Sequence, residues 1–249
     1  MPILVAMSLA LGCLIIFVAA IVRGFSGFGF SLLAITALSL IYTPAEIVPS
    51  IFMLEVAASL NLLPGIWKDI HWKSLVPLTA GCLVATPLGV WLLANVAPAP
   101  MQLAISIFVL AATFLMWKGY ALKSMPGPAA STAVGAASGL ANGAFGIGGP
   151  PVILFYFASP AGNIAGRASM IAFFIATDLI GLANQSVHGL ITRDTIFRAA
   201  FYLPALIAGV WLGTRGFKNV DQAVFRTSVL LILAGLAVIT MIKAVYTLA

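Results

Sequence analysis

Long apolar runs, separated by short polar or glycine- and proline-bearing stretches, dominate the chain. They cover about residues 2–22, 30–42, 47–64, 74–95, 101–120, 129–142, 150–160, 164–186, 196–213 and 224–246. A helix needs about 20 apolar residues to cross a bilayer, so we expect an all-α polytopic membrane protein with on the order of eight to ten transmembrane segments. No basic residue precedes the first run, which is therefore predicted to be a retained membrane segment rather than a secretory signal.

Composition supports this prediction. Of the 249 residues, 62% are hydrophobic and only 7% are charged, whereas soluble domains are nearer 45–50% apolar and about a quarter charged. A soluble enzyme or nucleic-acid-binding domain is thereby excluded. The net charge of +6 is typical of basic cytoplasmic loops in membrane proteins. Cys13 and Cys82 lie inside apolar runs, and we expect them to pack there, with no metal site and no cofactor.

Three sequence patterns occur twice in the same order. The glycine motif Gly24–Gly29, with glycine at its first, fourth and sixth positions, recurs 119 residues later as Gly143–Gly148. Ser50 and Ser169 are related by the same offset of 119. The third pattern, Gly-Val-Trp-Leu, begins at residue 89 and again at residue 209. These matches predict two homologous repeats, an organisation common among secondary transporters, in which substrate lies between the repeats.

The clearest boundary between the repeats contains two lysines and the sequence Met125-Pro126-Gly127-Pro128. We therefore assign residues 1–122 to the first membrane repeat, 123–128 to a linker and 129–249 to the second repeat. The loop richest in basic residues changes its position between the two halves: residues 67–73 in the first half, 215–226 in the second. This change favours an inverted over a parallel repeat.

The glycine motifs predict broken helices. Glycine costs about 1 kcal/mol relative to alanine inside a helix, and Pro150 and Pro151 after the second motif provide no backbone donors. A half-helix that begins after such a break directs free N–H groups and a positive dipole end at its surroundings. Two breaks that meet near the membrane midplane would bind an anion. The alternative is close helix packing, which Gly135, Gly139 and Gly143 fit first.

Two glycine-rich segments, Arg23-Gly24-Phe25-Ser26-Gly27-Phe28-Gly29 and Asn142-Gly143-Ala144-Phe145-Gly146-Ile147-Gly148-Gly149-Pro150-Pro151, resemble those of the TauE/SafE sulfite-exporter family (TSUP). The resemblance extends over nearly the whole chain. It implies transport of a sulfur-containing anion (sulfite, a sulfonate such as sulfoacetate or one derived from taurine, or a related carboxylate) across the bacterial inner membrane. The family's first segment is often richer in glycine and followed by proline, whereas here Phe30-Ser31-Leu32 follows.

Four ionisable residues within or beside apolar runs are functional candidates, because burying a charge in a membrane costs about 2.5–3.5 kcal/mol on insertion scales. Arg23 is expected to bind an anion in bidentate fashion or to end the first span as an interfacial arginine. Glu55 and Asp178 are candidates for proton coupling or for permanent pairing with an arginine. Arg167 is a candidate partner in such an ion pair or an interfacial anchor.

The candidate substrate-binding residues combine the break glycines with nearby donors. They are Arg23, Gly24, Ser26, Gly27, Gly29, Ser50, Asn142, Gly143, Gly146, Gly148, Gly149 and Ser169. Ser50 and Ser169 rank highest among the hydroxyl residues because they recur at the repeat offset. Ser31, Thr177 and Asn184 are weaker candidates, since membrane hydroxyls and amides often bond a carbonyl of their own helix.

These residues favour a secondary transporter that works by alternating access, with protons or Na⁺ as coupling ion, in a lipid bilayer and without a nucleic-acid partner. A hypothesis from another class is an intramembrane serine protease: residues 24–27 read Gly-Phe-Ser-Gly, with Ser26 as nucleophile and His188 as base. Against this, the second motif has Phe145 where the first has Ser26. A channel is a third hypothesis, but the sequence has no ring of like charges.

Overall fold

The computed structural model describes residues 2–60, 63–118, 124–158, 163–216 and 222–248, and every regular element in them is helical. The first half contains α1 (Pro2–Ser26), α2 (Phe30–Leu38), α3 (Pro44–Leu60), α4 (Leu63–Ile66), the 3₁₀ turn η1 (Trp67–Asp69), α5 (Trp72–Asn95) and α6 (Pro98–Lys118). The second half contains α7 (Pro128–Phe145), α8 (Gly149–Ala158), α9 (Asn163–Val187), α10 (Arg193–Gly216) and α11 (Gln222–Leu248).

The predicted all-α membrane fold is confirmed, and so are its broken helices. The short helix α2 follows α1 after a three-residue break, and α8 follows α7 in the same way. Among the described residues, stretches of six helices (α1, α5, α6, α9, α10 and α11) are long and apolar enough to cross a membrane. The division into repeats stays a prediction, and the first residue of the proposed linker, residue 123, lies outside the described part of the chain.

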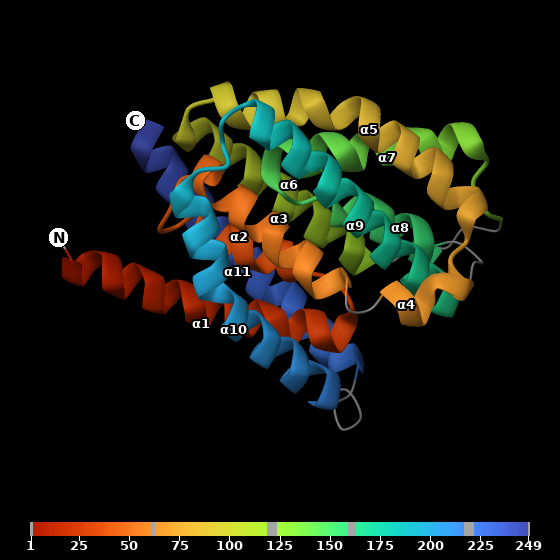
Figure 1. Cartoon of the computed structure of the whole chain (residues 1–249), viewed down its shortest axis with the longest axis horizontal. Helices are drawn as coiled ribbons and strands as arrows, with labels where there is room; N and C mark the ends of the chain where they lie inside the picture. Colours follow the sequence, from red (N-terminus) through yellow and green to blue (C-terminus); the bar gives the residue numbers. More distant parts are fainter. Residues whose placement is uncertain (1, 61–62, 119–123, 159–162, 217–221, 249) are drawn as a thin grey trace.

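The two halves interlock through their long helices (Figure 1). The most extensive contacts join α5 to α7 and α1 to α10. Glycines make both pairings possible: a Cβ at Gly81 or Gly89 would collide with the α7 backbone, and one at Gly213 would collide with that of α1. Small residues bring helices this close in membranes. Each half therefore contributes its first helix to a pair with a long helix of the other half.

Helices α3 and α9 cross the middle of the molecule in opposite directions (Figure 1). A Cβ at Gly181 of α9 would contact the Phe52 ring of α3. Ser50, the seventh residue of α3, donates a hydrogen bond to the carbonyl of Thr195 in the first turn of α10, and five residues separate α10 from the end of α9. The beginning of α3 is thus close to the end of α9, so the two helices run antiparallel.

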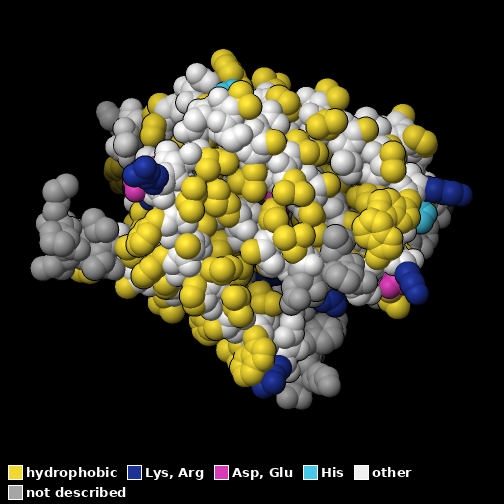
Figure 2. Space-filling model, in the orientation of Figure 1, with side chains coloured by type: hydrophobic (Ala, Val, Ile, Leu, Met, Phe, Trp, Pro, Cys, Tyr) yellow, Lys and Arg dark blue, Asp and Glu magenta, His cyan; other side chains and the backbone are white. Residues whose placement is uncertain are grey.

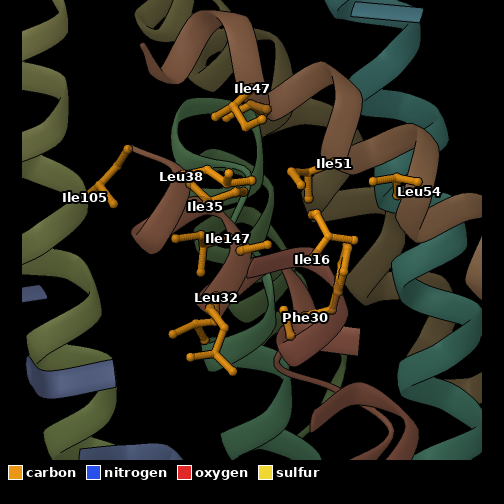
Figure 3. Close-up of a cluster of buried hydrophobic side chains, with 14 of the residues drawn as sticks. Ile16, Phe30, Leu32, Ile35, Leu38, Ile47, Ile51, Leu54, Ile105 and Ile147 are labelled. Atoms are coloured by element: carbon orange, nitrogen blue, oxygen red, sulfur yellow. The ribbon is translucent and has the colours of Figure 1, made fainter. Parts of the chain in front are cut away.

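The main hydrophobic core surrounds α2 (Figure 3). Leu32, Ile35 and Leu38 of this short helix are at most 4% exposed, and they lie beside Ile147 of the second break. Ile51 from α3 belongs to the same cluster. Phe28 of the first break packs against a second hydrophobic cluster, built largely from α8 and α9. Apolar side chains thus shield the irregular backbone, as membrane proteins require.

Hydrophobic side chains cover much of the face shown in Figure 2, and most charged side chains on it lie near its rim. Many large apolar residues on the long helices are exposed, among them Val84 at 80% and Ile207 at 61%. An apolar exterior of this kind suits contact with lipid.

Candidate functional site

Glycine conformation shapes both helix breaks. Gly27 and Gly29 in the first break have φ values of 82° and 89°, and Gly146 in the second has a φ of 70°. Residues with a side chain rarely adopt this left-handed region, whereas glycine enters it without steric cost. Gly29 caps the N-terminus of α2 and Gly146 caps the C-terminus of α7. The predicted glycine motifs therefore form the turns that interrupt the helices.

A small cavity lies between the two breaks. It is lined by backbone and side chains from α1, α2, α3, α7, α8 and α9, which makes it an interface of both halves. The lining residues are Arg23, Gly29, Ser31, Leu32, Glu55, Asn142, Ile147, Gly148, Gly149, Ile153, Phe174 and Asp178. Eight of the residues predicted from the sequence thus meet here: Arg23, Gly29, Glu55, Asn142, Gly148, Gly149 and Asp178, together with the weaker candidate Ser31.

At the first break, Arg23 is the centre of a buried polar cluster. Its side chain is 3% exposed; Nη1 forms an ion pair with Glu55 Oε2, and Nη2 donates to the hydroxyl of Ser59. The other carboxylate oxygen of Glu55 accepts hydrogen bonds from the Ser31 hydroxyl at 2.5 Å and the Ser31 backbone N–H at 3.3 Å. Glu55 therefore binds both the cation and the N-terminus of α2.

At the second break, a neutral amide takes the place of the guanidinium. Asn142 Nδ2 donates to Asp178 Oδ1 at 3.2 Å, and its Oδ1 accepts the backbone N–H of Gly148 at 3.1 Å. The Ser138 hydroxyl donates to the Gly148 carbonyl at 2.5 Å. Asn142 and Asp178 are 3% and 4% exposed. These bonds fix the shape of the break and leave Asp178 with an amide partner.

The cavity contains one positive and two negative groups. Asp178 lies within electrostatic range of both Glu55 and Arg23. Among the described residues, Arg23–Glu55 is the one salt bridge found. With both carboxylates ionised, the cavity would carry a net negative charge, which opposes an anion. This repulsion would fall if a carboxylate moved away, took up a proton or bound a cation.

The backbone donors at the breaks are less free than the sequence led us to expect. The N–H of Ser31 bonds Glu55, and that of Gly148 bonds Asn142. Pro150 and Pro151 at the start of α8 have no N–H. In this conformation the protein's own side chains therefore satisfy donors that we had assigned to a substrate.

Two pairs of predicted residues lie away from the cavity lining. Gly24 approaches the α10 backbone and Gly143 approaches that of α5, where an added Cβ would collide with main-chain atoms. Ser50 donates to the Thr195 carbonyl, and Ser169 accepts the N–H of His71. Both serines thereby join α3 or α9 to the start of the next long helix of the other half, so equivalent packing accounts for their recurrence.

The remaining candidates border the breaks. A Cβ at Gly27 would lie 3.1 Å from Nε of Arg167, and a Cβ at Gly146 would meet Ile35 and Val48. The side chain of Ser26 lies outside the described residues, so the protease hypothesis is not tested there. His188, the suggested base of that protease, follows Arg167 by 21 residues, which corresponds to about 30 Å along a helix. Since Arg167 lies beside Gly27 in the first break, this spacing indicates that His188 is far from that break.

Two features of the site were missed at the level of sequence. Ser59, which bonds Arg23, precedes Asp178 by the repeat offset of 119 residues, and Glu55 precedes Phe174 by the same offset. Applying that offset to every polar candidate would have found Ser59. The hydrogen bonds that Ser31, at the N-terminus of α2, donates to Glu55 have no such signal in the sequence, because they depend on how α3 packs against α2.

These features define a polytopic helical membrane protein with two broken helices around a buried polar cavity. The chain belongs to the sulfite exporter TauE/SafE family, whose model matches residues 12–240. It is 23% identical over 231 residues to the probable sulfite/organosulfonate exporter TauE of Cupriavidus necator, covering 90% of this chain and 89% of that protein. No solved structure matches the chain significantly.

Proposed function

We propose that the protein is a secondary transporter that binds a small sulfur oxyanion, sulfite or an organosulfonate, in the cavity between the two helix breaks. The family and the name of the C. necator relative support a sulfur-containing anion as cargo. The observation that carries the proposal is the buried guanidinium of Arg23, which lines a cavity formed by both halves of the chain.

The present partners of Arg23 indicate the type of ligand that its surroundings accept. Glu55 presents a planar pair of oxygens to Arg23 and Ser31. A sulfonate or sulfite presents similarly spaced oxygens, and guanidinium groups bind such oxyanions in bidentate fashion. The N-terminus of α2 adds a favourable dipole for negative charge. Glu55 thus occupies the position that we assign to the substrate.

Competition between Glu55 and the substrate provides a mechanism of coupling. Protonation of Glu55 removes its negative charge, weakens its hold on Arg23 and Ser31, and releases both donors to an incoming anion. Deprotonation after the anion has left restores the ion pair seen here. Asp178, across the cavity, keeps the local charge negative and makes proton uptake necessary for anion entry. The coupling ion is therefore a proton that moves with the anion.

Alternating access follows from the arrangement of the two halves. The antiparallel course of α3 and α9, which the sequence offset places in equivalent positions, supports an inverted repeat. Movement of one half against the other would open the cavity to each side in turn. The positive-inside distribution and the family support a location in the bacterial inner membrane.

A carboxylate is the second candidate cargo, because the donors at the first break already hold the carboxylate of Glu55. Both candidates are compared by flux into proteoliposomes with sulfite, sulfate, thiosulfate, taurine, sulfoacetate and simple carboxylates, with and without a pH gradient. We expect saturable flux of a sulfur oxyanion, accelerated by acid on the substrate side. A preference for a simple carboxylate would make carboxylates, rather than sulfur oxyanions, the substrate class. A complete absence of flux for all of these anions would contradict the proposal.

The coupling mechanism is tested with Glu55→Gln, and Asp178→Asn is its matched variant. Sulfoacetate is a suitable probe because its sulfonate stays ionised near neutral pH. Glu55→Gln mimics the protonated side chain, so we expect exchange flux that no longer responds to the pH gradient, whereas Asp178→Asn retains a response. The reverse result would assign coupling to Asp178 and overturn the mechanism through Glu55.

A further inference from the structure

The two helix breaks are covered by side chains of different character. An added Cβ at Gly27 would meet the guanidinium of Arg167, and one at Gly146 would meet Val48 and Ile35. The repeat offset of 119 residues relates Gly27 to Gly146 and Val48 to Arg167. The two contacts are therefore equivalent positions in the two halves, one cationic and one apolar.

These equivalent positions also differ in accessibility. Arg167 is exposed, whereas Val48 and Ile35 are 0% exposed. Arg167 lies near the start of α9. Because α3 runs antiparallel to α9, Val48 near the start of α3 lies close to the other end of α9. Buried apolar side chains thus pack around Val48 at one end of α9, and an exposed arginine lies at the opposite end.

Arg167 shares a helix face with the cavity. Phe174 and Asp178 follow it by seven and eleven positions on α9, a spacing that places all three on one side of an α-helix. Phe174 and Asp178 line the cavity, and a Cβ at Gly149 would lie 3.7 Å from the Phe174 ring. The distance from Arg167 to Phe174 is about 10 Å along the helix axis. One face of α9 therefore connects an exposed cation to the central site.

We propose that Arg167 is a second anion-binding position, at the mouth of the pathway, where it captures the oxyanion before the anion reaches the cavity. This inference rests on the function proposed above. The Val48–Ile35–Gly146 contact is the closed gate at the opposite end. An exposed cation beside a path concentrates anions and raises their rate of entry, and it adds little to affinity in the occluded site. A cation at the position of Val48 would have no contact with solvent, because that position is buried.

The effect of Arg167 is therefore specific to one side of the membrane. For Arg167→Gln we expect the half-saturation concentration for sulfoacetate to rise roughly tenfold when the anion is supplied at the Arg167 end, as loss of electrostatic steering implies. The half-saturation concentration from the other side stays unchanged. The maximal rate of transport toward the Arg167 end falls by a similar factor, because slower entry at that end also means slower release there. A higher ionic strength should raise the half-saturation concentration of the wild-type protein at the Arg167 end and leave that of the variant nearly constant, because salt screens the charge of Arg167. Arg167→Lys retains most of the wild-type behaviour.

Arg215→Gln is the matched control. Arg215 is also exposed, it stacks on Trp211 with its Cζ 3.8 Å from the ring centroid, and it lies near the end of α10 that pairs with the end of α1. Flux is measured in proteoliposomes with protein of known orientation, using radiolabelled sulfoacetate, or thiosulfate if sulfoacetate is not carried.

Three outcomes would overturn the proposal: an Arg167→Gln variant with wild-type half-saturation, a shift that is equal from both sides, or an equal shift in Arg215→Gln. A variant that only inserts or folds poorly would identify Arg167 as an interfacial anchor and would also overturn it. Absence of wild-type flux contradicts the proposed function instead, so the two failures are distinguishable.

Discussion

The two helix breaks share a backbone design and differ in the chemistry that they present. In the first, Arg23 bonds Ser59 and Glu55; in the second, Asn142 bonds Asp178. Asn142 corresponds to Arg23, and Asp178 to Ser59, by the same offset. Both breaks thus line one cavity, whereas single side chains decide which of them contains the cation. In the function that we propose, this difference would place a bound anion closer to the first break.

The largest expected effect comes from making the first break as neutral as the second. Arg23→Asn removes the buried cation and leaves Glu55 unpaired, which typically costs about 3–5 kcal/mol of stability. We expect severe destabilisation and loss of transport. The double variant Arg23→Asn/Glu55→Gln removes both charges, so it should recover much of the stability without recovering flux. Thermal unfolding in detergent and sulfoacetate flux per folded protein measure the two effects separately.

Wild-type flux in the double variant would show that the cation is structural. Two neutral breaks would then suffice for transport, so the presence of a cation at the first break alone would have no role in function.

An intermediate effect is expected when alanine replaces the equivalent glycines. Gly27→Ala and Gly146→Ala each place a side chain in left-handed backbone, at a cost of about 1–2 kcal/mol. At Gly146 the added methyl group also meets the buried side chains of Ile35 and Val48, and such overpacking costs about 1–3 kcal/mol more. At Gly27 it meets the exposed arginine at 3.1 Å, which can move away. Chemical denaturation should therefore find Gly146→Ala the less stable variant, and equal losses would contradict the closed gate.

The smallest effects are expected for the two recurrent serines. Ser50→Ala and Ser169→Ala each remove one hydrogen bond to the backbone of the other half, worth about 0.5–1.5 kcal/mol. We expect a slightly lower melting temperature and an unchanged half-saturation concentration for the transported anion. A clear change in half-saturation in either variant would return these serines to the binding site.

The sequence predicted the positions of the helices and of both breaks, because hydrophobic runs and glycine clusters act locally. It also predicted the charged residues Arg23, Glu55 and Asp178 at the cavity from the cost of burying ionisable groups in a membrane, and Asn142 from its equivalence to Arg23 at the repeat offset. It gave no indication that Glu55 bonds Ser31, since that contact depends on the packing of α3. Recurrence was an ambiguous signal: Gly27 and Gly146 recur as break glycines, whereas Ser50 and Ser169 recur as helix contacts.

The most direct test is a structure of the protein with a bound sulfonate, determined at a pH low enough to protonate Glu55. We expect density for the anion between the N-termini of α2 and α8, with its oxygens bonded to the Arg23 guanidinium and the Ser31 N–H, and with Glu55 turned away. Density for the anion elsewhere, with the Arg23–Glu55 ion pair intact, would contradict the proposed binding site.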